Sequence, residues 1–223
     1  MLKKLTEEKL AEVLEAGISE FADRGLQQAS MSAIAKRAGI SVGVLYKYYE
    51  NKEDFYTACV CRCTEELDTF LQELCSQEKK PLQYAKALIC AVQQFSHRNR
   101  DYVRLYHAAT CASEHTHAAA LARQVEGLRA KLYTEIIRRA QECGDVRSDL
   151  DPQMFAFFFD NLLMMTLFSY CCPYYQERFR LYAGQQASND SPFVTSQLLK
   201  FLESAFTLEE ADISHRQEKG ASV

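Results

Sequence analysis

Apolar residues recur at three- and four-residue steps from Thr6 to Arg24, and most of the positions between them are polar or charged. The recurring set is Leu10, Val13, Leu14, Gly17, Ile18 and Phe21. This spacing places the apolar side chains along one face and predicts an amphipathic helix. Gly25 is suited to end that helix, because glycine readily takes the left-handed conformation of a helix C-terminus.

Three further helices are expected before residue 80, each preceded by a polar residue that can cap it. The capping candidates are Ser30, Ser41 and Asn51. Their side-chain oxygens can accept hydrogen bonds from the unpaired backbone amides of the first helical turn. The helices that they precede are predicted at about residues 31–38, 42–49 and 52–76.

The rest of the chain is predicted to form longer helices, so the fold class is all-α. These helices are expected at about residues 81–97, 100–112, 117–143, 152–171 and 192–207. The four prolines fall where helices should start or stop. We expect an irregular surface loop over residues 173–192 and a frayed polar tail from Glu209.

The two short helices joined by "AGIS" meet the packing requirements of a helix-turn-helix. Gly39 permits the sharp turn, and the inward-facing set is Ile34, Ala35, Ala38, Ile40 and Leu45. Residues 30–49 contain no acidic residue and three basic ones, Lys36, Arg37 and Lys47. The outward face of this motif is therefore locally positive, although the whole chain carries a net charge of −4.

The stretch "EAGISEFADRGLQQASMSAIAKRAGISVGVLYKYYENKEDFYTA" resembles the N-terminal domain of the TetR family of transcriptional regulators. The glycine after the first helix, the "IAKRAGIS" core, the "LYKYY" recognition helix and the "NKED" start of the fourth helix occur in order. The resemblance implies a homodimer that reads double-stranded operator DNA and responds to a small-molecule effector. It implies a helix-turn-helix domain at residues 1–52, an effector-binding and dimerisation domain at 53–208, and a flexible tail at 209–223.

Carried over onto this chain, the resemblance assigns four residues to phosphate contacts. Ser30 and Ser41 would meet phosphates at helix N-termini through their hydroxyls and backbone amides. The Tyr46 hydroxyl would donate to a phosphate, and Lys52 would pair with another. Tyr49 occupies the position at which the family buries an aromatic ring.

The resemblance also implies which residues face the bases. Lys47 would be the main reader of a base edge, and guanine is the base that suits it best. Tyr48 would reach a phosphate or a base, and Gly43 would let the helix approach the DNA backbone closely. Val42 and Val44 depart from the family pattern, which more often has polar or basic residues there. Val44 could contact a thymine methyl group, which leaves less readout by hydrogen bonding.

The composition of the chain indicates the cellular compartment in which we expect the protein. The N-terminal segment carries charges where a signal peptide needs an apolar stretch, so we expect no export. Nine cysteines in a chain that is not exported indicate free thiols in a reducing cytoplasm. No uninterrupted apolar run reaches the length of a membrane span, so no membrane partner is expected. No motif calls for a cofactor.

The segment "PQMFAFFFDNLLMMTLFSY" is apolar nearly all round, which indicates a helix buried on more than one side. The resemblance implies that this helix and the final one pair with their symmetry mates in a four-helix dimer interface. An effector pocket is expected among the central helices, for an apolar or planar ligand with few polar anchors. Its candidate lining residues are Phe95, Tyr102, Leu105, Tyr106, Phe158, Phe159, Leu162, Met165 and Phe168, each of which could also be plain core.

A second interpretation starts from His107, Cys111 and His115, which recur at four-residue steps. An unbroken helix would place these metal-ligand types on one face, as a metal-sensing regulator would require. The segment is expected to cross a helix break, however, and no second paired motif accompanies it. A regulator that senses thiol oxidation is a third interpretation, and an enzyme using Cys111 with a neighbouring histidine is a fourth. We expect no enzymatic activity and no bound metal.

Overall fold

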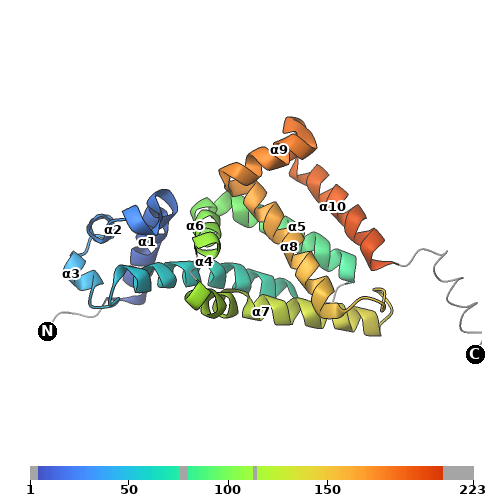
Figure 1. Ribbon diagram of the computed structural model, residues 1–223, viewed down its shortest axis with the longest axis horizontal. Coiled ribbons are helices and arrows are strands. Elements are labelled where there is room, and N and C mark those ends of the chain that lie inside the picture. The colour runs from blue at the N-terminus through green and yellow to red at the C-terminus, as the bar shows by residue number, and fades with distance from the viewer. Residues whose placement is uncertain (1–4, 76–79, 113–114, 208–223) are drawn as a thin grey trace, which may run out of the picture.

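The computed structural model of the protein describes residues 5–75, 80–112 and 115–207, and these residues form ten α-helices and no strand (Figure 1). The predicted all-α fold class is therefore confirmed. The helices are α1 (Glu7–Gln28), α2 (Met31–Arg37), α3 (Val42–Leu45), α4 (Lys52–Cys75), α5 (Pro81–Arg98), α6 (Arg100–Ala112), α7 (His115–Glu142), α8 (Pro152–Cys171), α9 (Pro173–Ser188) and α10 (Ser191–Phe206). The predicted tail from Glu209 lies outside the described residues.

Helices α1 to α3 form a small unit at one end of the molecule, and α4 runs from it into the larger helical body (Figure 1). The apolar stripe of α1 packs on the first turns of α4, where the ring centroids of Phe21 and Phe55 lie 5.8 Å apart. Further along, α4 contacts α5, α6 and α7. The long helix α4 and the packing of α1 on α6 therefore join the two parts of the protein.

Two helix ends differ in detail from the prediction. Gly25 has a φ of 69° and interrupts α1 as expected, but one more turn follows it and ends at Gln28. The helix expected to continue to about residue 49 ends at Leu45, so that prediction was wrong. The amides of Lys47 and Tyr48 donate to the carbonyls three residues earlier, at 3.1 and 3.0 Å, so the chain tightens into turns there.

The expected surface loop at residues 173–192 is wrong, because most of it forms α9. Pro173 occupies the first helical turn, where a missing backbone N–H does no harm. Gly184, with a φ of 79°, kinks the helix before it ends at Ser188. Ser188 is the one buried residue of α9. The sequence of this helix therefore has no apolar stripe from which the helix could be predicted.

Helix α8 lies at the centre of the larger body. It is long and apolar enough to cross a membrane by length and composition alone. It contacts α5, α6, α7 and α9, which is the position of a core helix. Asp151 caps its first turn by accepting a hydrogen bond from the Met154 amide at 2.9 Å. Burial on several sides explains the apolar residues that face its neighbours, whereas Met154, Phe157 and Phe158 are apolar and exposed.

Candidate DNA interface and effector cavity

The helix-turn-helix has the small, buried contact surface that its sequence predicts. Ile34, Ala35 and Leu45 are each 1 % exposed, and Ala38 is buried beside them. Gly39 has a φ of 66°, the left-handed conformation that lets the chain turn between α2 and α3. These contacts fix the angle between the two helices and leave the opposite side of α3 facing solvent.

Both short helices carry the expected caps. The Ser30 hydroxyl accepts a hydrogen bond from the Ala33 amide, and the Ser41 hydroxyl accepts one from the Val44 amide, each at 3.3 Å. Ser30 and Ser41 are exposed, so their hydroxyls and the first amides of α2 and α3 lie at the surface. A helix N-terminus with exposed amides favours an anion such as a phosphate.

The outward face of α3 is exposed and carries no acidic side chain. Val42 and Tyr46 are 36 % and 47 % exposed, and Lys47 is exposed as well. Val44 is half-buried. A Cβ atom added to Gly43 would meet only the Ser41 hydroxyl, at 4.0 Å, so no packing within the protein requires glycine at this position.

The two tyrosines that follow have contacts inside the protein. Tyr49 packs on Phe55, with ring centroids 4.7 Å apart, which confirms its predicted anchoring role. Burial raises the pKa of the Tyr49 hydroxyl. The Tyr48 hydroxyl accepts a hydrogen bond from the Leu5 amide at 2.6 Å, so it holds the segment before α1 against the end of the helix-turn-helix.

Lys52 has a structural role that the sequence did not indicate. Its ammonium group donates to the carbonyls of Gln27 and Ala29, at 3.0 and 3.5 Å, at the end of α1. An ammonium has three N–H donors, so one remains for a further partner such as a phosphate. The buried Glu20 also acts at this junction, where it accepts a hydrogen bond from the Ser30 amide at 3.3 Å.

A cavity of about 870 Å³ lies among α6, α7 and α8 in the larger body. Three of the predicted lining residues, Tyr106, Met165 and Phe168, line it. The others lie outside this lining, at Phe95, Tyr102, Leu105, Phe158, Phe159 and Leu162. Phe157 and Phe158 are both 59 % exposed, and of the two only Phe157 contributes to the cavity wall.

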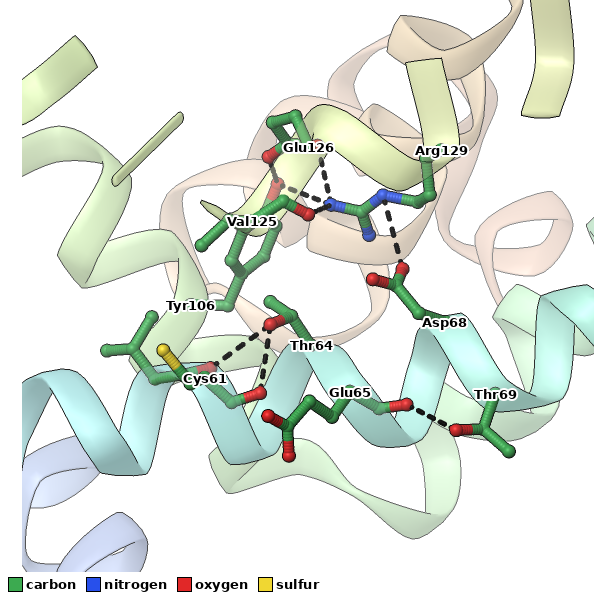
Figure 2. A network of polar contacts seen from close by, with 10 residues as sticks. Cys61, Thr64, Glu65, Asp68, Thr69, Tyr106, Val125, Glu126 and Arg129 are labelled. Carbon is green, nitrogen blue, oxygen red and sulfur yellow. Dashed lines mark hydrogen bonds and ion pairs between the residues drawn. The ribbon is translucent and has the colours of Figure 1, made fainter. Parts of the chain in front are cut away.

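A buried polar cluster backs one wall of this cavity, and the sequence analysis missed it (Figure 2). The Arg129 side chain is 2 % exposed, and its Nη2 donates to Glu126 Oε2 at 2.5 Å. Its Nε lies 3.6 Å from Asp68 Oδ1 on α4. The Tyr106 hydroxyl of α6 donates to Glu126 Oε1. The only sequence signal for this cluster was the pair of opposite charges three residues apart on α7, which usually marks an exposed helix face.

Burial shifts the pKa values of two groups at this wall, Tyr106 and Asp160. It raises the pKa of the Tyr106 hydroxyl, so that group stays protonated and serves as a donor. Burial also raises the pKa of Asp160 to about 6, although the Arg129 guanidinium opposes this effect. Asp160 and Glu126 both line the cavity, so the polar wall carries carboxyl groups that ligands can reach.

The histidine and cysteine candidates are only partly brought together. His107 Nε2 lies 3.6 Å from Cys111 Sγ on α6, and burial lowers the pKa of the His107 imidazole. α6 ends at Ala112 and α7 begins at His115, and the predicted helix break between Cys111 and His115 falls on residues 113–114, which lie outside the described residues. The position of the His115 side chain is outside what the structure describes. Among the described residues no three His, Cys, Asp or Glu side chains are placed to hold a metal ion.

Apolar side chains are exposed on α8 and α10. The set comprises Met154, Phe157, Phe158, Phe193 and Phe201, which are between 45 % and 61 % exposed. Large exposed apolar patches on soluble proteins usually mark interaction surfaces.

The structure thus combines a small helix-turn-helix head with a larger all-α body that holds a cavity open to the surface. Residues 13–59 match the family described as bacterial regulatory proteins, tetR family. The N-terminal part of the chain, which contains the helix-turn-helix, is therefore similar to that family.

Curated relatives share mainly the N-terminal part. The nucleoid occlusion factor SlmA of Haemophilus ducreyi is 27 % identical over 106 residues, which are 47 % of this chain and 52 % of the relative. An uncharacterized HTH-type transcriptional regulator of Mycobacterium tuberculosis is 36 % identical over 69 residues, 30 % of this chain and 35 % of the relative. The chain thus spans about half the length, or less, of the curated relatives that it matches.

Solved structures share the whole fold at low sequence identity. FadR from Bacillus subtilis, in complex with stearoyl-CoA, superposes with a TM-score of 0.72 at 14 % identity, covering 89 % of this chain and 100 % of that one. AibR, in complex with isovaleryl coenzyme A and operator DNA, gives a TM-score of 0.58 at 18 % identity, covering 71 % and 85 %. These likenesses establish the arrangement of helices.

Proposed function

We propose that this protein is a ligand-responsive transcriptional regulator that binds operator DNA as a homodimeric repressor in the cytoplasm. In this proposal residues 1–52 bind DNA, and residues 53–208 bind a small, largely apolar effector and form the dimer. Effector binding releases the protein from its operator. The observation that carries the DNA role is the exposed, acid-free face of α2 and α3, with capped helix N-termini beside it.

The exposed side chains divide into phosphate contacts and base contacts. Ser30, Ser41 and the Tyr46 hydroxyl are placed at the surface, where they can donate to phosphates. Lys47 is the principal polar reader of a base edge. Val42 offers an apolar contact to a thymine methyl group.

Four neighbouring positions add to this surface. Val44 is half-buried, so it offers a smaller apolar contact than Val42. Gly43 leaves room for close approach of the DNA backbone. Tyr48 supports the surface through its bond to Leu5, and Lys52 has one donor left for a phosphate.

The exposed apolar side chains of α8 and α10 support dimerisation. A second copy of the same surface would cover them in a symmetric interface, in which each helix meets its symmetry mate. Two reading heads held by that interface could enter successive major grooves. The expected operator therefore contains two half-sites related by a two-fold axis.

Helix α6 connects the cavity to the reading head, which supports release by an effector. Tyr106 and Thr110 of α6 line the cavity. Nearer the start of α6, the Tyr102 hydroxyl donates to Glu15 of α1, and Arg104 Nη1 lies 3.0 Å from Asp23 of α1. A ligand that prefers one position of α6 would bias the position of α1 and, with it, the spacing of the heads.

A DNA-binding assay on the segment that flanks the gene of this protein tests the proposal. Lys47→Ala should relax base preference, since it removes the base reader. Lys52→Ala should weaken binding to all sequences alike and reduce the salt slope by about two in the dimer, about one per head. Lys86→Ala, an exposed lysine on α5, is the matched control and should change neither. Equal effects of all three substitutions would refute the assignment of the interface.

A further inference from the structure

The cavity has aromatic walls and one polar end. Four rings line it, from Tyr106, Tyr133, Phe157 and Phe168. Met164 and Met165 add flexible apolar surface. A space of about 870 Å³ with such walls suits a ligand with an apolar body. The polar end of the cavity determines which chemical head group a bound ligand can carry.

Several of the hydroxyl and amide donors that line the cavity are already used within the protein. The Thr110 hydroxyl donates to the His107 carbonyl at 3.0 Å, and the Thr134 hydroxyl donates to the Ala130 carbonyl at 2.7 Å. The Tyr106 hydroxyl donates to Glu126, and the Asn161 amide donates to the Phe157 carbonyl at 2.7 Å. These bonds leave the carboxyl groups as the acceptors beside them, while the exposed Gln153 and Lys131, which also line the cavity, carry N–H donors.

The strongest of these acceptors is Asp160. Its carboxyl group makes no hydrogen bond or short ion pair with any side chain in the described part of the chain, yet it lines the cavity. Glu126 lies at the same end, and its two oxygens already accept from Tyr106 and Arg129. A carboxylate has about four lone-pair sites, so Glu126 can accept from a ligand as well.

The charge of this end is not balanced by the protein. Asp68, Glu126 and Asp160 all interact with the single guanidinium of Arg129, so three carboxyl groups share one cation. The one basic side chain in the described lining is Lys131, which is exposed at the surface. Glu126 and Asp160 are half-buried, and partly buried carboxylates without a matching cation are unfavourable, so a cation placed among them would relieve that cost. Aromatic walls also attract cations through the faces of their rings.

We propose that the cavity accepts a ligand whose apolar body carries a cationic nitrogen head, an ammonium or amidinium group, received by Asp160 and Glu126. This proposal rests on the effector-binding role proposed above and names the chemical class of the effector. The head donates N–H bonds to the Asp160 carboxylate and to a free lone pair of Glu126. The body lies along the rings of the cavity wall.

Isothermal titration calorimetry with three probes of one shape tests this proposal. The probes are 4-phenylbutylamine, which is an ammonium at neutral pH, 4-phenylbutan-1-ol and 4-phenylbutanoate, and octanoyl-CoA is included as a ligand with an anionic carrier. At about pH 7.5, where Asp160 is ionised, the ammonium should bind at least about tenfold more tightly than the alcohol. The carboxylate should bind most weakly of the three.

Two variants test whether Asp160 causes the preference for ammonium over alcohol. Asp160→Asn keeps the shape of the side chain and should reduce the preference for ammonium over alcohol to less than about threefold. Glu203→Gln removes an exposed carboxylate of α10 that does not line the cavity, so it should leave the preference unchanged. Thermal unfolding of both variants shows that they are folded.

Several results would overturn the proposal: equal binding of ammonium and alcohol, tighter binding of 4-phenylbutanoate or octanoyl-CoA, an unchanged preference in Asp160→Asn, or no ammonium binding at about 1 mM. Operator binding is measured separately on the same samples. Loss of the head-group preference with operator binding intact contradicts this inference alone. Tight ammonium binding with no effect on the operator complex contradicts the proposed release mechanism and leaves the ligand class standing.

Discussion

Replacing Gly17 with alanine should destabilise the protein, although alanine is the better helix former. A Cβ atom at this position of α1 would lie 2.5 Å from Phe55 Cζ, 2.6 Å from Phe55 Cε1 and 2.7 Å from Cys59 Sγ. Phe55 is fully buried and packs against Phe21 and Tyr49. It therefore cannot withdraw, and α1 and α4 must move apart.

The magnitude follows from two opposing effects. Overpacking a core by one methyl group costs about 1–3 kcal/mol. Glycine to alanine inside a helix contributes about 1 kcal/mol in the other direction. With contacts this short we expect a net loss of about 1–2 kcal/mol in the free energy of unfolding.

Gly127 provides the matched control, because it also lies inside a helix, α7, but nothing lies within 4 Å of an added Cβ atom. Gly127→Ala should stabilise the protein by about 0.5–1 kcal/mol. Urea unfolding followed by circular dichroism measures both variants. If Gly17→Ala stabilises the protein as much as Gly127→Ala does, the packing of α1 on α4 described above is incorrect.

Two further substitutions test the polar groups. The pKa of Asp160 is raised to about 6 from its ordinary 3.8, so its ionisation destabilises the folded protein as the pH rises above about 4. Asp160→Asn should therefore raise the free energy of unfolding at about pH 8 by at most roughly 3 kcal/mol, and it should change that free energy little at about pH 4. Urea unfolding measures both values, and an effect of the substitution that does not depend on pH would contradict this reasoning. Ser41→Ala should remove the α3 cap, at about 1 kcal/mol, and weaken binding to all DNA sequences, whereas Ser41→Asn should retain most of the affinity in an anisotropy assay. Equal losses in the two variants would show that capping is not the cause.

The helix-turn-helix could be predicted closely because its signals are local. Ser30, Ser41 and Asn51 each cap the helix that follows, and the Asn51 side chain accepts from the Asp54 amide at 2.7 Å. Gly39 marks the one turn that needs a left-handed residue. Each of these features depends on residues within a few positions along the chain.

The cavity could not be predicted in the same way. α8 is apolar all round, so its sequence does not show that Phe157 borders the cavity and that Phe158 does not. Arg129 and Glu126 have the spacing of a surface ion pair, but Arg129 is buried beside Asp68 of α4, which is distant in sequence. α9 was missed because it buries almost nothing. In each case the outcome depends on tertiary packing.

The most direct test of the account is fluorescence anisotropy of the wild-type protein with a palindromic segment from the DNA flanking its own gene, against a scrambled segment of the same composition. The account predicts a salt-dependent complex and a preference for the palindrome of roughly a thousandfold, the low end of specific recognition, because Val42 and Val44 offer no hydrogen bonds. Equal affinity for the two segments, or affinity that does not change with salt, would contradict it.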